Sequence, residues 1–243
     1  MADLSKINDF HIHIGKSHEP LWEIDLRTIL SSKKENHIEK MLIMASPVDP
    51  DLDNKLVYEY AHSNPEIYGL HWFVPTSNKI EFSDKIVGIK YHGAYLNNPV
   101  TSMSKYILEE LDKQKKILLV HCGRYLEGDI KSNTSYLHAI QVARHYPNIK
   151  VVIAHMGGTD TTVCKKAISH AEGLYNVYFD TSGITTPSII EYACNRLPVT
   201  RILFGSDWPW CSFKAMYYTV MDAAISNLSK QDILYNNFEM ILK

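Results

Sequence analysis

The sequence predicts an α/β protein that folds as a single (β/α)8 TIM barrel, regular or slightly distorted. Short apolar, β-branched runs alternate with amphipathic stretches along all 243 residues. The runs are apolar on both sides, as expected for parallel strands between a barrel interior and outer helices. Ionisable residues stand at the ends of several runs, and barrel enzymes carry out their chemistry at the carboxyl ends of their strands.

Eight runs are expected to be strands, and most precede a segment long enough for a crossover helix. They span residues 6–13, 38–44, 67–73, 87–91, 117–121, 150–155, 177–180 and 201–205. Apolar residues at helical spacing follow over 103–111 and 213–225. Parallel strands joined by right-handed crossovers cannot form a hairpin meander, which favours a closed barrel. An open doubly wound sheet is the alternative, but no Gly-x-Gly-x-x-Gly follows the first strand.

Composition indicates one globular domain over residues 1–243 and a cytoplasmic location. Hydrophobic residues make up 45% of the chain, and no Pro/Gly/Ser tract or charge block divides it. Lys and Arg number 25 against 27 Asp and Glu, so charge gives no sign of nucleic acid or of an anionic membrane as partner. The four scattered cysteines suggest free thiols. The sequence contains neither a signal-peptide pattern nor an apolar run of about 20 residues.

The first strand carries two histidines in Asp9-Phe-His-Ile-His. Side chains two residues apart on a strand point to the same side, so His11 and His13 can both reach one ion such as Zn²⁺. A pair of structural histidines bonded to backbone carbonyls is the alternative for this spacing.

His121 and Asp207 stand at the ends of two later strands. His121 follows Ile117-Leu-Leu-Val, and Asp207 ends Ile202-Leu-Phe-Gly-Ser-Asp. With the first two histidines they would make a set of three imidazoles and one carboxylate, which suits zinc and leaves a position for water or substrate. Trp-Pro after Asp207 argues against a helix cap there. Asp207 is therefore expected both to bind the metal and to accept a proton from the attacking water.

His155 ends the run Val151-Val-Ile-Ala-His and is expected to assist catalysis. Its predicted role is to donate a hydrogen bond to a substrate oxygen as negative charge develops there. A buried histidine tied to a neighbouring loop is the alternative.

Four further residues are expected to contact substrate. Lys90 lies in Gly88-Ile-Lys-Tyr-His at the end of an apolar run. It could bind a substrate carboxylate, form a bridging carbamate between two metals, or pair with an acid. Arg124 could hold an anionic group bidentately, or form a surface salt bridge instead. His92 and Trp208 are expected to line the mouth of the barrel.

Six motifs in this order resemble the amidohydrolase superfamily. They are Asp-x-His-x-His, the Gly-Ile-Lys strand, the strand ending in His121, Ala-His-Met-Gly-Gly, Tyr-Phe-Asp-Thr-Ser-Gly and Ile-Leu-Phe-Gly-Ser-Asp-Trp-Pro. The chain is most similar to the amidohydrolase 2 branch, which includes the aminocarboxymuconate-semialdehyde decarboxylase-like enzymes. The resemblance runs from about Asp9 to Ile233-Leu-Tyr-Asn-Asn-Phe near the end.

The resemblance implies a barrel with a divalent metal, usually zinc, with one ion expected and a second left open. The ligands would be His11, His13, His121 and Asp207, with His155 assisting catalysis. Asp180 would be structural or would support the ligands. A homodimer is also implied. Members hydrolyse, decarboxylate or hydrate, so the fold does not name the reaction.

These observations predict a metal-dependent hydrolase of a small amide, ester or lactone that bears a carboxylate. A decarboxylase of a small unsaturated carboxylic acid, using the same site, is the nearest alternative. A non-catalytic barrel that binds a metal or a metabolite is a third. Release of CO₂, release of an acid or amine, or no turnover at all would separate the three.

Overall fold

The computed structural model describes residues 5–18, 21–76, 80–123 and 132–243. The strands are β1 (Ile7–His18), β2 (Leu21–Ile24), β3 (Ile38–Ala45), β4 (Ile67–Trp72), β5 (Ile86–Tyr91), β6 (Ile117–Val120), β7 (Lys150–Ile153), β8 (Val177–Asp180) and β9 (Ile202–Leu203). The α-helices are α1 (Leu26–Glu35), α2 (Pro50–Ser63), α3 (Gly93–Leu96), α4 (Lys105–Lys113), α5 (Tyr136–His145), α6 (Thr161–His170), α7 (Pro187–Arg196), α8 (Phe213–Asp222), α9 (Asn227–Gln231) and α10 (Asn237–Ile241).

The strands in the described part of the chain form one nine-stranded sheet in the order β2-β1-β3-β4-β5-β6-β7-β8-β9. Every pair from β1–β3 to β8–β9 is parallel, whereas β2 pairs antiparallel with the outer part of β1. Backbone hydrogen bonds then join the end of the sheet to its beginning. They run from Phe10 N to Phe204 O (2.9 Å), from Asp207 N to His11 O (2.9 Å) and from His13 N to Trp208 O (2.8 Å). The eight parallel strands therefore close into the predicted barrel.

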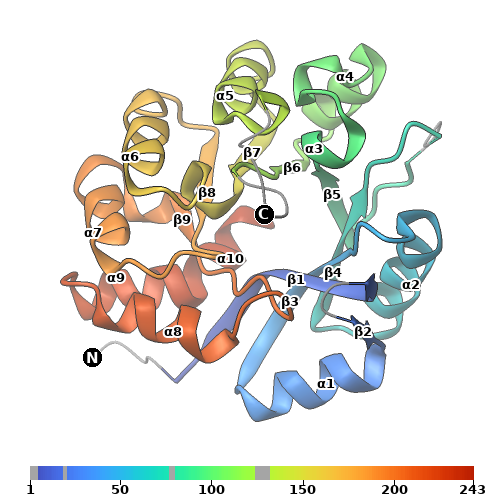
Figure 1. Ribbon diagram of the computed structural model, residues 1–243, viewed down its shortest axis with the longest axis horizontal. Coiled ribbons are helices and arrows are strands. Elements are labelled where there is room, and N and C mark those ends of the chain that lie inside the picture. The colour runs from blue at the N-terminus through green and yellow to red at the C-terminus, as the bar shows by residue number, and fades with distance from the viewer. Residues whose placement is uncertain (1–4, 19–20, 77–79, 124–131) are drawn as a thin grey trace.

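Each of the eight predicted strands is present, although β1 continues to His18 and β9 is only two residues long. The expected helices over 103–111 and 213–225 correspond to α4 and α8. Helices ring the barrel, as Figure 1 shows in a view along its axis. Several begin at a side-chain cap: Asp25 for α1, Asp49 for α2, Ser135 for α5, Asp160 for α6 and Ser212 for α8. No helix among the described residues is long and apolar enough to cross a membrane.

The strand residues alternate between two apolar layers. One cluster fills the barrel interior with side chains such as Leu42, Leu70 and Leu119, and a larger one lies between strands and helices. In β1 the register against β3 shifts between Asp9 and Ile12. Phe10 belongs to the interior cluster and Ile12 to the outer one. A bulge of this kind re-aims side chains, so His11 and His13 also face the interior, above the apolar filling.

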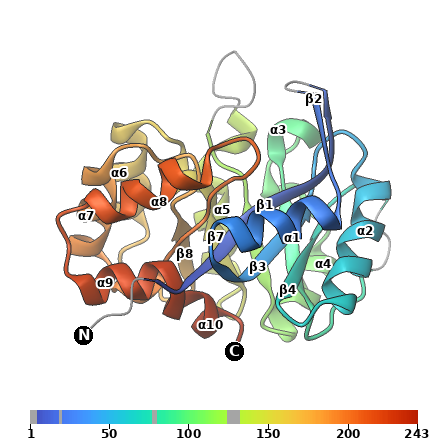
Figure 2. The same cartoon turned by 90° about the horizontal axis from the view of Figure 1, so that it is seen from below.

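The two ends of the barrel differ. The β1–β2 hairpin rises at the end where the parallel strands finish, whereas α10 and the C-terminus lie at the opposite end (Figure 2). The described residues of the predicted site belong to the first of these ends, where barrels place their active sites.

Candidate active site

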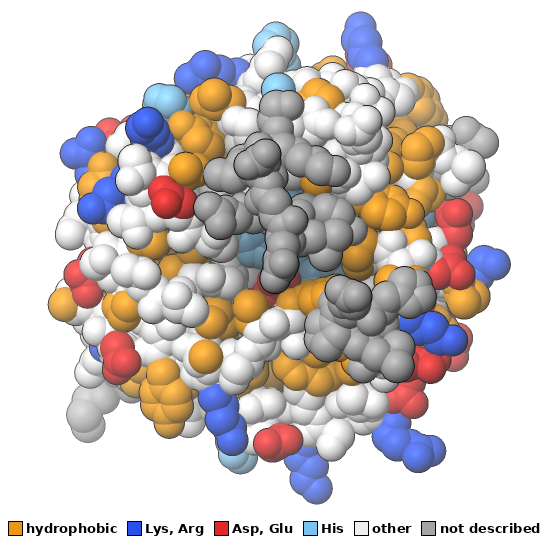
Figure 3. Space-filling model, in the orientation of Figure 1, with side chains coloured by type: hydrophobic (Ala, Val, Ile, Leu, Met, Phe, Trp, Pro, Cys, Tyr) orange, Lys and Arg blue, Asp and Glu red, His pale blue; other side chains and the backbone are white. Residues whose placement is uncertain are grey.

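The predicted site residues follow strand after strand around the barrel mouth. His11 and His13 lie on β1, and Lys90 on β5. Residues that follow strands supply the others: His92 and His121 come directly after β5 and β6, and His155 and Asp207 come within a few residues of the ends of β7 and β9. Histidine side chains are visible at the centre of this face, with hydrophobic side chains around them (Figure 3).

Three of these side chains meet in a small triangle. His11 Nε2 lies 3.3 Å from His13 Nε2, and each nitrogen lies 3.4 Å from Asp207 Oδ1. A tetrahedral ion with bonds of about 2.0–2.1 Å holds its ligands about 3.3–3.4 Å apart. The triangle therefore has the spacing that one zinc-like ion requires of three ligands.

The other nitrogen of each imidazole is bonded to an acceptor. His11 Nδ1 lies 2.8 Å from Asp180 Oδ2, and His13 Nδ1 lies 2.9 Å from the Ala45 carbonyl. Since neither oxygen can donate, both Nδ1 atoms carry the proton, and both Nε2 lone pairs face the triangle. Carboxylate or carbonyl partners of this kind commonly orient histidine ligands of metals. The donor set fits a divalent cation.

Burial and charge keep His11 and Asp207 in the protonation states that bind a cation. Burial, together with the Lys90 charge, lowers the pKa of His11 to about 4, so its imidazole is neutral. Burial alone would favour a neutral Asp207, but its contacts with His13, His11 and His155 hold the pKa of this carboxyl well below its usual range. Neutral imidazoles and an ionised carboxylate are the forms that bind metals.

Lys90 is buried beside the triangle. Its side chain is 1% exposed, and Nζ lies 3.1 Å from His11 Nε2, to which it donates. Burial lowers the pKa of Lys90 to about 8, with the charges of Asp207 and Asp180 acting in the opposite direction. A metal at His11 Nε2 would displace this hydrogen bond and free the amine for another partner.

His155 is held by a network centred on Asp180. His155 N donates to Asp180 Oδ1 (2.9 Å), and so does the Ser182 hydroxyl (2.5 Å). Ser182 also meets His155 Nδ1, through Oγ at 2.8 Å and through its carbonyl at 3.0 Å. Because the hydroxyl proton is used on Asp180, both Ser182 oxygens are acceptors, and His155 Nδ1 must carry a proton. His155 therefore exchanges protons with the site at Nε2.

Two site residues have left-handed backbone conformations. The φ angles of His155 and Asp207 are 56° and 60°. Side chains other than glycine adopt this region at a cost, and such strain is concentrated at functional positions. Both residues lie where a strand has just ended, and the turn directs them into the mouth.

His121 belongs to a stack of rings rather than to the triangle. Its ring lies 3.9 Å from that of His92 with the planes 11° apart, and His92 in turn stacks on Trp72 at 5.5 Å. His121 Nδ1 lies 3.1 Å from His155 Nε2. The group of nearby metal-binding atoms that the described residues form contains His11, His13 and Asp207, without His121.

The remaining predicted residues have different placements. His92 is buried, and its Nδ1 accepts a hydrogen bond from Tyr95 N at 3.2 Å at the start of α3. Trp208 is partly buried and packs against the outer cluster. Arg124 lies outside the described residues. Cys122 is buried in the outer cluster, where burial raises its thiol pKa.

Asp9 is a buried carboxyl below the triangle. Its Oδ1 accepts from His11 N (3.1 Å) and Ser206 N (3.0 Å), whereas Oδ2 has no hydrogen-bond partner among the described atoms. Burial raises the pKa of Asp9 to about 7. The side chain ties β1 to the turn that carries Asp207.

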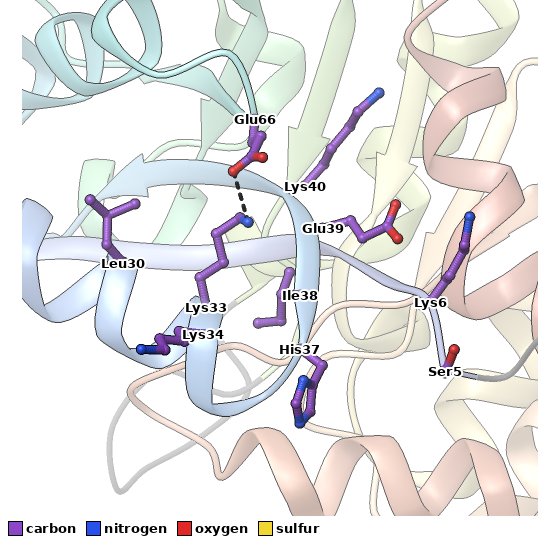
Figure 4. Close-up of a pocket in the computed structure, with 10 residues that line it drawn as sticks. All are labelled: Ser5, Lys6, Leu30, Lys33, Lys34, His37, Ile38, Glu39, Lys40 and Glu66. Carbon is purple, nitrogen blue, oxygen red and sulfur yellow. Dashed lines mark ion pairs between the residues drawn. The ribbon is translucent and has the colours of Figure 1, made fainter.

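The opposite end of the barrel has a cavity without this chemistry. It has a volume of about 780 Å³ and contains the ion pair between Lys33 and Glu66, whose atoms are 2.7 Å apart (Figure 4). None of the predicted site residues that the structure describes lines it. The lining residues are Ser5, Lys6, Leu30, Lys33, Lys34, His37, Ile38, Glu39, Lys40 and Glu66.

Sequence reasoning did not single out Ser182 or Trp72 and gave Asp180 only a supporting role. Asp180 is fully buried at the end of β8, and it joins His11 to His155. Its position after Val177-Tyr-Phe was a usable signal, since it repeats the pattern of an ionisable residue that ends an apolar strand. Ser182 and Trp72 carry no such signal.

Solved structures share this fold. A 2,6-dihydroxybenzoate decarboxylase from Rhizobium superposes with a TM-score of 0.72 at 14% identity, covering 98% of each chain. A dihydroxybenzoic acid decarboxylase from a Polaromonas species, with bound manganese and the inhibitor 2-nitroresorcinol, gives 0.71 at 15% identity over 98% of this chain and 96% of that one. A probable 2-pyrone-4,6-dicarboxylic acid hydrolase from Acinetobacter baumannii, with citric acid bound, gives 0.72 at 16% identity over 97% and 98%.

Comparison at the level of sequence gives the family. No curated protein matches the chain significantly. The amidohydrolase family model matches residues 47–237, which is more than half of the chain and includes Lys90, His121, His155, Asp180 and Asp207. His11 and His13 precede the matched residues, and the fold brings them to the same mouth. The chain is therefore a member of the amidohydrolase 2 family of the amidohydrolase superfamily.

Proposed function

We propose that this protein is a metal-dependent hydrolase of a small amide, ester or lactone that carries a carboxylate. The observation that supports this most is the triangle of His11 Nε2, His13 Nε2 and Asp207 Oδ1, with sides of 3.3–3.4 Å. Its spacing, its buried imidazoles and its ionised carboxylate together suit one divalent ion. Zinc is the proposed ion, because two imidazoles and a carboxylate are a common zinc donor set.

His121 is proposed as a further ligand, coordinating through Nε2. Its Nδ1 already faces His155. Because Ser182 holds the proton of His155 on Nδ1, His155 Nε2 can accept a hydrogen bond from His121 Nδ1. This bond would keep the His121 proton on Nδ1 and leave its Nε2 lone pair for a metal.

The chain's own residues would then share the proton transfers. A bound divalent ion would polarise the substrate carbonyl and lower the pKa of the attacking water. Asp207 accepts the proton of that water and returns it to the leaving nitrogen or oxygen. His155 is proposed to donate to the developing oxyanion from Nε2, in a step in which Nε2 carries a proton and has turned from His121 to the substrate oxygen.

Lys90 is proposed to bind the substrate carboxylate. Its ammonium group is desolvated at the base of the mouth, and a metal held by His11 would release it from its present hydrogen bond. A substrate carboxylate would compensate the buried charge. A carbamate bridging two ions is the other role that the position of Lys90 permits. His92, Trp208 and Arg124 are proposed to line the substrate site.

Decarboxylation is the second candidate, favoured by the decarboxylases among the structures of the same fold. In that reaction the bond between the substrate carbon and its carboxylate breaks, and CO₂ leaves. Asp207, which is ionised at rest, would first take a proton from water in the site and then deliver it to the substrate carbon. The same site serves both reactions, because both need a cation and a proton-transferring carboxylate.

Metal analysis combined with a substrate panel tests the proposal. We expect about one divalent ion per chain and turnover of at least one carboxylate-bearing ester, lactone or amide, with release of an acid, alcohol or amine. Release of CO₂ from a dihydroxybenzoate-like acid would select the second candidate. Stoichiometric metal without turnover of any compound would favour a binding protein, and absence of metal from protein purified without chelators would contradict the whole proposal.

A further inference from the structure

Two adjacent polar residues of α2 are buried where that helix packs against the barrel. Asp53 is 2% exposed and Asn54 5%. An outer helix normally turns such side chains to solvent, because burying a polar group costs free energy unless it finds a partner. Their partners are the carboxyl ends of the strands that surround His13.

Asn54 pairs with the backbone of Trp72 as a neighbouring strand would. Its Nδ2 donates to the Trp72 carbonyl at 2.9 Å, and its Oδ1 accepts from Trp72 N at 2.8 Å. Two hydrogen bonds thereby fix the last residue of β4. The fully buried Trp72 ring meets the ring of His13 edge-on, with centroids 6.1 Å apart. A shift of Trp72 would remove one wall of the space that holds His13.

Asp53 contacts the segment after β3 and the strand β1. Its Oδ2 lies 3.2 Å from the hydroxyl of Ser46, the residue after β3. The last residue of β3 is Ala45, whose carbonyl accepts from His13 Nδ1. The carboxyl also covers Gly15 of β1, where a Cβ would lie only 1.8 Å from Asp53 Oδ2. The close approach between α2 and Gly15, together with the φ of 92° there, favours glycine at that position.

Two contacts of the His13 ring, those with Trp72 and with the Ala45 carbonyl, are thus anchored by one turn of α2. Asn54 anchors Trp72, which borders the ring, and Asp53 anchors the segment that contains the carbonyl on Nδ1. We infer that Asp53 and Asn54 form a clamp that positions His13 for metal binding. The inference rests on the proposed function, because it assigns these residues to the proposed metal centre.

Metal affinity of an Asn54→Ala variant tests the clamp, with Asn176→Ala as the matched control. Asn176 is also buried and donates to three backbone carbonyls, but it precedes β8 at the opposite end of the barrel. Competition with a chelator for Zn²⁺ should show affinity weakened roughly 10- to 100-fold in the first variant. The Zn²⁺ affinity of the control variant should remain within about twofold of the wild-type affinity. Equal effects in both variants would overturn the inference.

A second measurement separates this inference from the proposed function. In metal-free protein, the ring N–H that His13 donates to Ala45 should exchange with solvent at least tenfold faster in Asn54→Ala and unchanged in Asn176→Ala, as followed by NMR. If the wild type binds no metal, the proposed function fails, and this exchange rate still decides the clamp. If Asn54→Ala does not fold, Asn54→Asp retains the acceptor for Trp72 N and should show the same effects. Unchanged exchange in a folded Asn54 variant would refute the clamp.

Discussion

Asp180 and His11 are joined by a hydrogen bond of 2.8 Å between Oδ2 and Nδ1, and both side chains are fully buried. The bond holds the proton of His11 on Nδ1 and turns the Nε2 lone pair toward His13 and Asp207. The other oxygen of Asp180 accepts from His155 N and Ser182. One carboxylate therefore aligns a proposed metal ligand and the histidine proposed to assist catalysis.

Asp180→Asn should weaken metal binding while the fold is retained. The amide is nearly isosteric, but its oxygen is a weaker acceptor than a carboxylate, and its NH₂ group facing His11 would favour the wrong tautomer. We expect the affinity for Zn²⁺ to fall roughly 10- to 100-fold, as measured by competition with a chelator. Asp112→Asn is a control, since Asp112 bonds Asn148 at the surface. Wild-type affinity in Asp180→Asn would show that this carboxylate does not orient His11.

Gly205→Ala should also displace His11, because Gly205 packs against its Cβ. A Cβ at position 205 would lie 2.8 Å from His11 Cβ, closer than such atoms approach in proteins. Because the barrel interior is tightly packed, His11 would have to shift, and its place in the triangle with His13 and Asp207 would change. We expect metal affinity to fall more than about tenfold, the loss found when the support of a ligand is removed. Circular dichroism would check that the barrel persists, and a folded variant with unchanged affinity would contradict the close approach.

The strands could be predicted from sequence because each is a short local apolar run. The run at 201–205 is longer than the two-residue strand β9, since Phe204 N bonds the Ile233 carbonyl and Phe204 O accepts from Phe10 N of β1. The short strand β2 was not predicted. Its four residues form a strand only by pairing with Gly15–His18, and no local pattern marks such a pairing.

The site could be predicted only in outline. A residue at the end of a parallel strand must lie at the barrel mouth, which is why His11, His13 and Asp207 could be grouped. The position along the chain does not determine which atoms meet, and His121 lies against His155 instead of in the triangle. The burial of Asp53 and Asn54 on α2 could not be predicted either, because in the sequence they resemble ordinary solvent-facing residues of a helix.

Asp53 should make stability depend on pH. Burial raises the pKa of its carboxyl from 3.8 to about 6, so the folded protein holds this proton more tightly than the unfolded chain does. The stabilisation is complete below about pH 4 and is lost as the pH rises through about 6. The free energy of unfolding of the wild type, relative to Asp53→Asn, should therefore fall by on the order of 1–3 kcal/mol between about pH 4 and 7.5. Urea denaturation of both proteins measures this, and parallel pH profiles would contradict it.

Asp207→Asn should nearly abolish turnover, because the amide cannot accept the proton that the proposed hydrolysis removes from water. We expect kcat to fall by roughly 10²- to 10⁴-fold, the usual contribution of a general base. Asp207 is also a proposed ligand, so kcat must be measured at saturating metal, with the bound ion counted in the same sample. A metal-loaded variant that keeps more than about a tenth of wild-type kcat would leave Asp207 as a ligand only. The base would then have to be sought at His155 Nε2, the other proton-accepting atom that the hydrogen bonds of this site define.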